Sequence, residues 1–88
     1  MELNELRNEI NQIDDEILKL FLRRMEVTDQ VADYKRQHDL PIYQPQREQE
    51  ILESVSERAG ELGCYARSLF STLMELSRQY QAYRGGTP

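Results

Sequence analysis

The chain opens on a long amphipathic segment that runs from Leu3 to Gln37 and reads LNELRNEINQIDDEILKLFLRRMEVTDQVADYKRQ. Its apolar residues recur in alternating steps of three and four, which is typical of one face of an α-helix. They are Leu3, Leu6, Ile10, Ile13, Ile17, Leu20, Val27, Val31 and Tyr34. This spacing predicts one long helix over the whole segment.

One position on this apolar face carries a charge. Arg24 stands where the period of the helix predicts an apolar residue. An uncompensated charge on a buried face costs several kcal/mol, so an anion is expected to neutralise it. The alternative is that the arginine stem packs along the face while the guanidinium group reaches water. Arg24 is therefore the first candidate for a ligand-binding residue.

The rest of the chain predicts two further helices. The periodicity stops after Gln37, and Pro41 favours a loop that ends at Pro45, a residue suited to the first turn of a helix. This second helix ends before Gly60, and a third runs from residues 64–66 to about Tyr83. No strand alternation and no internal repeat is found, so the predicted fold is all-α, with a long, a short and a medium helix.

Length and composition restrict the class of protein. The chain has 88 residues, of which 39% are hydrophobic and 31% charged, with a formal charge of −5. We expect one domain over residues 1–84, a flexible tail over residues 85–88, and no room for a second catalytic domain. The negative charge argues against a nucleic-acid partner. With no apolar run of about 20 residues and no signal-like start, no membrane partner is expected, and the predicted location is the cytoplasm.

The cysteine and histidine content gives no sign of a metal site. Cys64 is the single cysteine, which excludes an internal disulfide and a cysteine metal cluster. His38, in the predicted loop, has no second ligand at a metal-binding spacing. We therefore expect neither a metal nor a cofactor.

The length of the first helix predicts a dimer. A helix of this length would extend for about 50 Å, whereas a compact chain of this size has a radius of gyration of only about 12 Å. The helix should therefore project beyond its own fold and expose part of its apolar face. A second copy is the expected cover, so the sequence predicts an intertwined homodimer in which the first helices run alongside each other.

Polar side chains recur on helix faces that should be buried or that flank the buried face. They comprise four cations, one carboxylate and two neutral hydrogen-bonding groups. These residues are Arg7, Arg24, Lys35, Arg47, Glu48, Ser77 and Gln81. Each has a plainer interpretation, such as a solvated cation or a charge that favours a helix dipole. Their occurrence together on three helices instead indicates a pocket for a dianion that carries a hydroxyl group.

The spacing of these cations predicts a site shared between chains. Arg7 lies roughly 25 Å from Arg24 along the helix axis and about 42 Å from Lys35, too far for one small ligand to reach both ends within one chain. In an antiparallel pair of helices, Arg7 of one copy can approach Arg24 and Lys35 of the other.

These residues also carry a resemblance to a known family. The spacing of residues 6–14 (LRNEINQID), Arg23-Arg24, Lys35, Pro41-Ile42 and residues 45–48 (PQRE) resembles that of the all-helical, AroQ-type chorismate mutases. The resemblance covers nearly the whole chain. It implies a three-helix, domain-swapped dimer with two sites, each of which rearranges chorismate to prephenate for phenylalanine and tyrosine synthesis without a cofactor.

The resemblance also implies a role for each site residue. Arg7 of one copy and Arg24 of the other would hold the two carboxylates of the substrate. Lys35 would reach the ether oxygen and a carboxylate, and Gln81 would be the second donor to the ether oxygen. Arg47 accompanies Glu48 after the loop.

Three further positions complete the implied site. Glu48 would bind the ring hydroxyl group, and Ser77 would contact a carboxylate. Gln44 departs from the family pattern, in which many members have an aspartate. A glutamine caps a helix less well, but a contribution through the backbone N–H of Gln44 would preserve the contact to the hydroxyl group.

Two other functions remain open at this stage. One is an isochorismate-pyruvate lyase of the same fold, although the segment from Pro41 to Arg47 resembles the mutase loop more closely. The other is a helical dimerisation module without catalytic activity. A module of that kind would tolerate Arg24→Ala and would show no stabilisation by a ligand.

Overall fold

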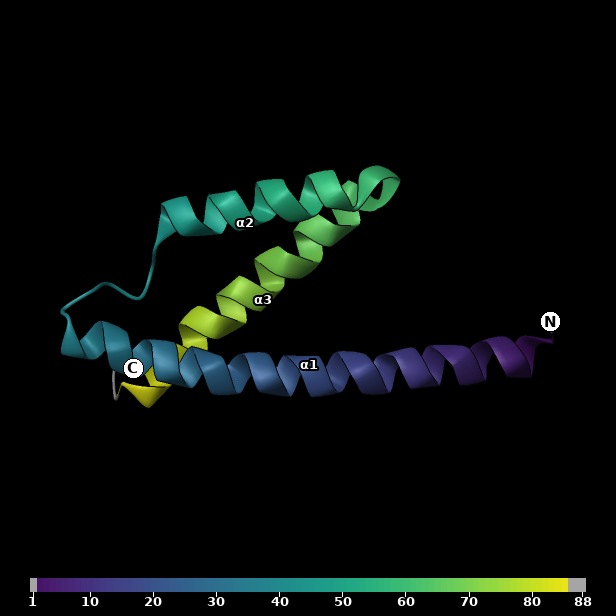
Figure 1. Cartoon of the computed structure of the whole chain (residues 1–88), viewed down its shortest axis with the longest axis horizontal. Coiled ribbons are helices and arrows are strands. Elements are labelled where there is room, and N and C mark those ends of the chain that lie inside the picture. Colours follow the sequence, from purple (N-terminus) through teal and green to yellow (C-terminus); the bar gives the residue numbers. More distant parts are fainter. Residues whose placement is uncertain (1, 86–88) are drawn as a thin grey trace.

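The computed structural model describes residues 2–85 and contains three α-helices joined by a loop and a short 3₁₀ turn (Figure 1). In chain order the elements are α1 (Leu3–Gln37), α2 (Pro45–Arg58), the 3₁₀ turn η1 (Gly60–Leu62) and α3 (Gly63–Arg84). Within the described residues there is no strand, so the predicted all-α fold is confirmed. The bounds of α1 and the start of α2 match those predicted, whereas η1 was not predicted.

The molecule is elongated because α1 is much longer than its neighbours. The chain measures 54 × 25 × 19 Å, with a radius of gyration of 16.1 Å. A compact chain of this length would have a radius of gyration of about 12 Å. Within its N-terminal half, α1 extends past the ends of both α2 and α3 (Figure 1). The predicted overhang of the first helix is therefore confirmed.

The connection between α2 and α3 is tight because glycine occupies two positions. Gly60 has a φ of 58°, in the left-handed region that residues with a side chain rarely adopt. At Gly63, an added Cβ would lie only 2.7 Å from the backbone oxygen of Ser56. These glycines allow α3 to fold back beside α2.

The middle position in this arrangement belongs to α3. It packs against both α1 and α2, whereas the described residues of α1 and α2 have no close backbone approach to each other (Figure 1). Side chains from α1 and α2 consequently face each other across a gap that α3 closes on one side.

The loop between α1 and α2 closes one end of this gap. After α1, the backbone N–H of Leu40 donates to the carbonyl of Lys35 at 2.8 Å, and Asp39 adopts a φ of 54°. Aspartate tolerates this left-handed conformation better than most residues. The chain thus reverses direction and carries Ile42 back past the last turn of α1, before Pro45 starts α2.

The single chain has very little apolar core. Among the described residues, Ala32 and Met74 are the only apolar side chains that are buried. The buried polar residues are Thr28, Ser77 and Gln81. Polar side chains therefore occupy much of the protected interior, as expected for a binding site and not for a packed core.

The N-terminal half of α1 instead leaves its apolar face exposed. Its exposed fractions are 54% for Ile10, 56% for Ile13, 56% for Ile17 and 67% for Leu20. A continuous apolar stripe of this kind is typical of a protein-protein interface.

Two remaining expectations concern the chain as a whole. The described residues include no helix that is both long enough and apolar enough to cross a membrane. Of the tail predicted for residues 85–88, Gly85 donates its backbone N–H to the carbonyl of Gln81 at 3.0 Å, and residues 86–88 lie outside the described part of the chain.

Candidate functional site

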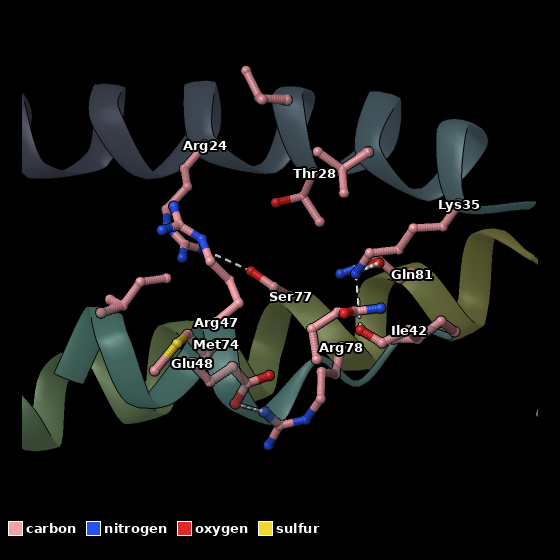
Figure 2. A pocket seen from close by; sticks show the side chains of 14 residues that line it. Arg24, Thr28, Lys35, Ile42, Arg47, Glu48, Met74, Ser77, Arg78 and Gln81 are labelled. Atoms are coloured by element: carbon pink, nitrogen blue, oxygen red, sulfur yellow. Dashed lines mark hydrogen bonds and ion pairs between the residues drawn. The ribbon is translucent and has the colours of Figure 1, made fainter. Parts of the chain in front are cut away.

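A cavity of about 360 Å³ occupies the gap between α1 and α2. Its walls come from the C-terminal half of α1, the loop, the first turns of α2 and one face of α3 (Figure 2). The lining residues are Arg24, Val27, Thr28, Val31, Lys35, Ile42, Gln44, Arg47, Glu48, Ile51, Met74, Ser77, Arg78 and Gln81. The volume lies within the usual range for small-molecule sites.

Seven of the eight residues predicted for the site line this cavity. They are Arg24, Lys35, Gln44, Arg47, Glu48, Ser77 and Gln81. Arg7 does not line it, because it lies on the projecting half of α1. One chain therefore brings together all the predicted residues except Arg7, which sequence reasoning assigned to a partner.

Arg24 reaches the cavity because of its register on α1. It lies one turn before Thr28 and 11 residues, about three turns, before Lys35, so the three side chains share one face of the helix. Its Nη1 donates a hydrogen bond to Oγ of Ser77 at 2.5 Å (Figure 2). The bond holds the guanidinium group between α1 and α3, where it can face an anionic group of a ligand.

Lys35 is the most constrained cation of the cavity. Its Nζ donates to the carbonyl of Ile42 at 2.8 Å and to Oε1 of Gln81 at 3.0 Å (Figure 2). Burial lowers the pKa of Lys35 below its ordinary value of 10.5, and the carboxylate of Glu48 partly opposes this effect. Because two of the three N–H donors of the ammonium group bond to Ile42 and Gln81, one N–H is left for a ligand.

Gln81 presents its amide from the buried face of α3. Only 6% of the residue is exposed. Because its Oε1 accepts the hydrogen bond from Lys35, the groups it can offer to a ligand are the two N–H donors of Nε2. Lys35 and Gln81 together form a pair of donors at one end of the cavity.

The start of α2 supplies the opposite wall. Gln44 is the N-cap residue and makes no side-chain capping bond; its Nε2 donates to the carbonyl of Pro41 at 3.0 Å. Arg47 and Glu48 follow in the first turn and line the cavity. The weak capping expected from glutamine at this position is therefore observed.

Arg78 is a site residue that the sequence analysis missed. Its Nη1 donates to Oε1 of Glu48 (Figure 2). Its guanidinium carbon lies 5.1 Å from the ring centroid of Tyr43. The hydrogen bond to Glu48 raises the pKa of Arg78 above its ordinary value. A signal was available, because Arg78 lies three residues before Gln81 and so on the same side of α3.

The cavity is strongly cationic. Its lining contains Arg24, Lys35, Arg47 and Arg78 against the single carboxylate of Glu48, a balance of four positive charges to one negative. No cysteine or histidine is among the lining residues. Within the part of the chain that the structure describes, no three metal-ligating side chains form a cluster. This arrangement can bind and orient a small dianion and can donate hydrogen bonds to charge that develops on it.

Comparison with known proteins gives a family match over most of the chain. The family model described as chorismate mutase type II matches residues 6–82. The chain is 38% identical over 80 residues to the T-protein of Haemophilus influenzae, a match that covers 91% of this chain and 21% of that protein. No solved structure matches the chain significantly.

Two shorter matches agree with this result. The bifunctional chorismate mutase/prephenate dehydratase of Aquifex aeolicus is 44% identical over 54 residues, which is 61% of this chain and 15% of that protein. The chorismate mutase of Methanocaldococcus jannaschii is 40% identical over 53 residues, which is 60% of this chain and 54% of that protein. The chain thus spans only part of the length of the curated relatives it matches.

Proposed function

Because this chain belongs to the chorismate mutase type II family, we propose that it catalyses the rearrangement of chorismate to prephenate, in the cytoplasm and for phenylalanine and tyrosine synthesis. The observation that carries the proposal is the cavity, which gathers four cations, one carboxylate and a buried amide from three helices. Chorismate is a dicarboxylate with a ring hydroxyl group and an ether oxygen. Each of these groups has a counterpart among the lining side chains.

The reaction requires no nucleophile, metal or proton transfer. One bond breaks and one forms within a single molecule, so the protein has two tasks. It must hold the substrate in the compact conformer in which the reacting carbons meet, and it must stabilise charge on the ether oxygen. Orientation alone can contribute several kcal/mol to lowering the barrier.

In this proposal Lys35 and Gln81 stabilise the ether oxygen. Negative charge grows on this oxygen as its bond to carbon breaks. The Nζ of Lys35 and the Nε2 of Gln81 are neighbouring donors, because Lys35 also bonds Oε1 of Gln81 at 3.0 Å. Preorganised donors of this kind contribute about 3 kcal/mol each in other enzymes, because they need no reorganisation during the reaction.

The remaining lining residues orient the substrate. Arg24, held by Ser77 at 2.5 Å, binds a carboxylate, and Ser77 contacts the same group. Arg47 adds positive charge at the start of α2, and Glu48 accepts a hydrogen bond from the ring hydroxyl group. Gln44 contributes its backbone N–H at the same end of the cavity.

The complete site requires a second copy of the chain. Arg7 lies on the projecting half of α1, beside the exposed stripe of Ile10, Ile13 and Ile17. In an intertwined homodimer, the projecting half of one copy lies along the cavity of the other and supplies Arg7 to a substrate carboxylate. The near absence of an apolar core in one chain supports this assembly, because pairing would bury the stripe.

A direct assay tests the proposed function. Purified protein is mixed with chorismate, and both the loss of chorismate absorbance and the formation of prephenate are followed. We expect turnover by the wild-type chain, strong loss in Lys35→Ala and little change in Arg36→Ala. Arg36 is a matched control, since it is the next residue of α1 but pairs with Asp33 at the surface.

Other outcomes would identify the competing functions. Formation of pyruvate and salicylate from isochorismate, without turnover of chorismate, would assign the chain as a lyase. No turnover of either substrate by a folded dimer would indicate a dimerisation module.

A further inference from the structure

The proposed function leaves Arg78 without a role, although its side chain lines the cavity. It projects from α3 and forms an ion pair with Glu48 on α2. Its guanidinium group also lies beside the ring of Tyr43 in the loop, at 5.1 Å from the ring centroid. This distance is typical of a cation-π contact. Arg78 therefore connects α3 to both the loop and the first turn of α2.

We infer that Arg78 is a positioning residue that fixes the carboxylate of Glu48 so that its second oxygen accepts a hydrogen bond from the ring hydroxyl group of the substrate. The inference rests on the proposed function. Oε1 of Glu48 is occupied by Nη1 of Arg78, which leaves Oε2 for the ligand (Figure 2). Arg78 acts through Glu48 and is not assigned a contact with the substrate.

The ion pair also protects the donor pair at the other end of the cavity. The carboxylate of Glu48 interacts electrostatically with the ammonium group of Lys35. A glutamate with no other cation in contact would be free to turn toward Lys35 and would compete with the substrate for its remaining N–H. In the structure Glu48 pairs with Arg78, whereas Lys35 bonds to Ile42 and Gln81. Arg78 thus keeps the carboxylate of Glu48 away from the donor pair of Lys35 and Gln81.

The loop is held at two successive residues by this arrangement. The carbonyl of Ile42 accepts from Lys35 at 2.8 Å, and the ring of Tyr43 lies beside Arg78. Removal of Arg78 would therefore free both the carboxylate of Glu48 and the side of the loop next to it. A displacement of about 1 Å in a positioning group can reduce the rate by up to a hundredfold, and we expect a loss of about tenfold.

The test compares Arg78→Met, Arg78→Lys and wild-type protein in the chorismate assay. Methionine keeps an unbranched side chain and removes the charge. We expect kcat/KM to fall about tenfold in Arg78→Met and to recover at least in part in Arg78→Lys. Arg84→Met is the matched control, because Arg84 also joins α3 to another helix through an ion pair, with Asp29, outside the cavity. The control should retain wild-type activity.

A double-mutant cycle and an altered substrate identify the route of the effect. In a Glu48→Gln background, Arg78→Met should change kcat/KM by less than about twofold, since its partner carboxylate is already absent. With an analogue that lacks the ring hydroxyl group, the loss of kcat/KM in Arg78→Met should be smaller than with chorismate, because the hydrogen bond from the hydroxyl group to Glu48 is then absent in both proteins. A purely structural role would lower the rate for both substrates equally. The melting temperature of each variant is measured alongside, to detect a loss of stability.

The outcomes separate this inference from the proposed function. Wild-type turnover with an equally active Arg78→Met variant would overturn the inference alone, as would a loss that is the same in the Glu48→Gln background. Absence of wild-type turnover would overturn the proposed function and the inference with it. If Arg78→Met does not fold, the same double-mutant cycle is measured with Arg78→Lys in its place. The inference is overturned if the effect of Arg78→Lys is the same with and without Glu48→Gln.

Discussion

Replacement of Gln81 by glutamate tests the role of the buried amide through pH. Gln81 is 6% exposed, and its Oε1 accepts from Lys35, so Nε2 is the group that we propose as the donor to the substrate. A carboxylate at this position has no proton to donate, and the loss of one donor costs about 3 kcal/mol, or about a hundredfold in rate. Repulsion between the carboxylate and the charge on the ether oxygen lowers the rate further.

Protonation should restore the missing donor. A carboxyl group with a pKa of about 4.3 is protonated in roughly one molecule in 500 at pH 7 and in about one in six at pH 5. Burial raises this pKa and the ammonium group of Lys35 lowers it, so the two shifts oppose each other. We therefore expect kcat/KM of Gln81→Glu, relative to wild type, to rise at least about tenfold between pH 7 and pH 5.

Steady-state assays of chorismate loss at both pH values measure this ratio. Gln81→Met is the matched control, because it removes the donor without adding a titratable group, and it should remain slow at both pH values. Equal rates for wild type and Gln81→Glu at neutral pH would refute the role given to Gln81. A ratio that does not change with pH would refute it as well.

Three other predictions follow from the same geometry. Lys35→Met removes the charged donor at 3.0 Å from Gln81, so kcat/KM should fall about a hundredfold or more in the chorismate assay, and a loss below about fivefold would contradict the assignment. Because burial lowers the pKa of Lys35 below 10.5, the ammonium group loses its proton as the pH rises through that lowered value. A pH profile of wild-type kcat/KM should then decline on the alkaline side before pH 10.5, and an unchanged rate up to that pH would oppose the prediction. Ile13 is 56% exposed in one chain, and Ile13→Asp places a charge on the exposed apolar stripe of α1. Sedimentation should then show dissociation to monomers, with loss of activity. An active dimer would place the interface elsewhere.

The sequence was most informative where one period extends over many residues. The alternating steps of three and four from Leu3 to Tyr34 predicted α1 to its observed bounds, because 35 residues of one period leave little room for another structure. The single charge within that period also identified Arg24 as a cavity residue. A buried helix face tolerates few polar residues, so each exception carries information.

The sequence places Arg78 on the same side of α3 as Gln81, but its pairing with Glu48 could not be predicted, because that partner is 30 residues away on another helix. An arginine on the third helix is usually a solvated cation, and its contact with Glu48 exists only once α2 and α3 fold together. The turn η1 was missed for a similar reason, since two glycines around Glu61 and Leu62 are equally compatible with an irregular loop. Patterns predict the helices well, whereas pairings between helices require the tertiary structure.

The central claim is that each site takes Arg7 from one copy and Lys35 from the other, and subunit mixing measures this most directly. Arg7→Ala and Lys35→Ala are each expected to be nearly inactive. When the two variants are unfolded and refolded together, about half of the dimers should be mixed, and each mixed dimer should contain one intact site of two. We predict that mixing restores about a quarter of the wild-type activity. Activity that stays at the average of the two separate variants would contradict a site shared between chains.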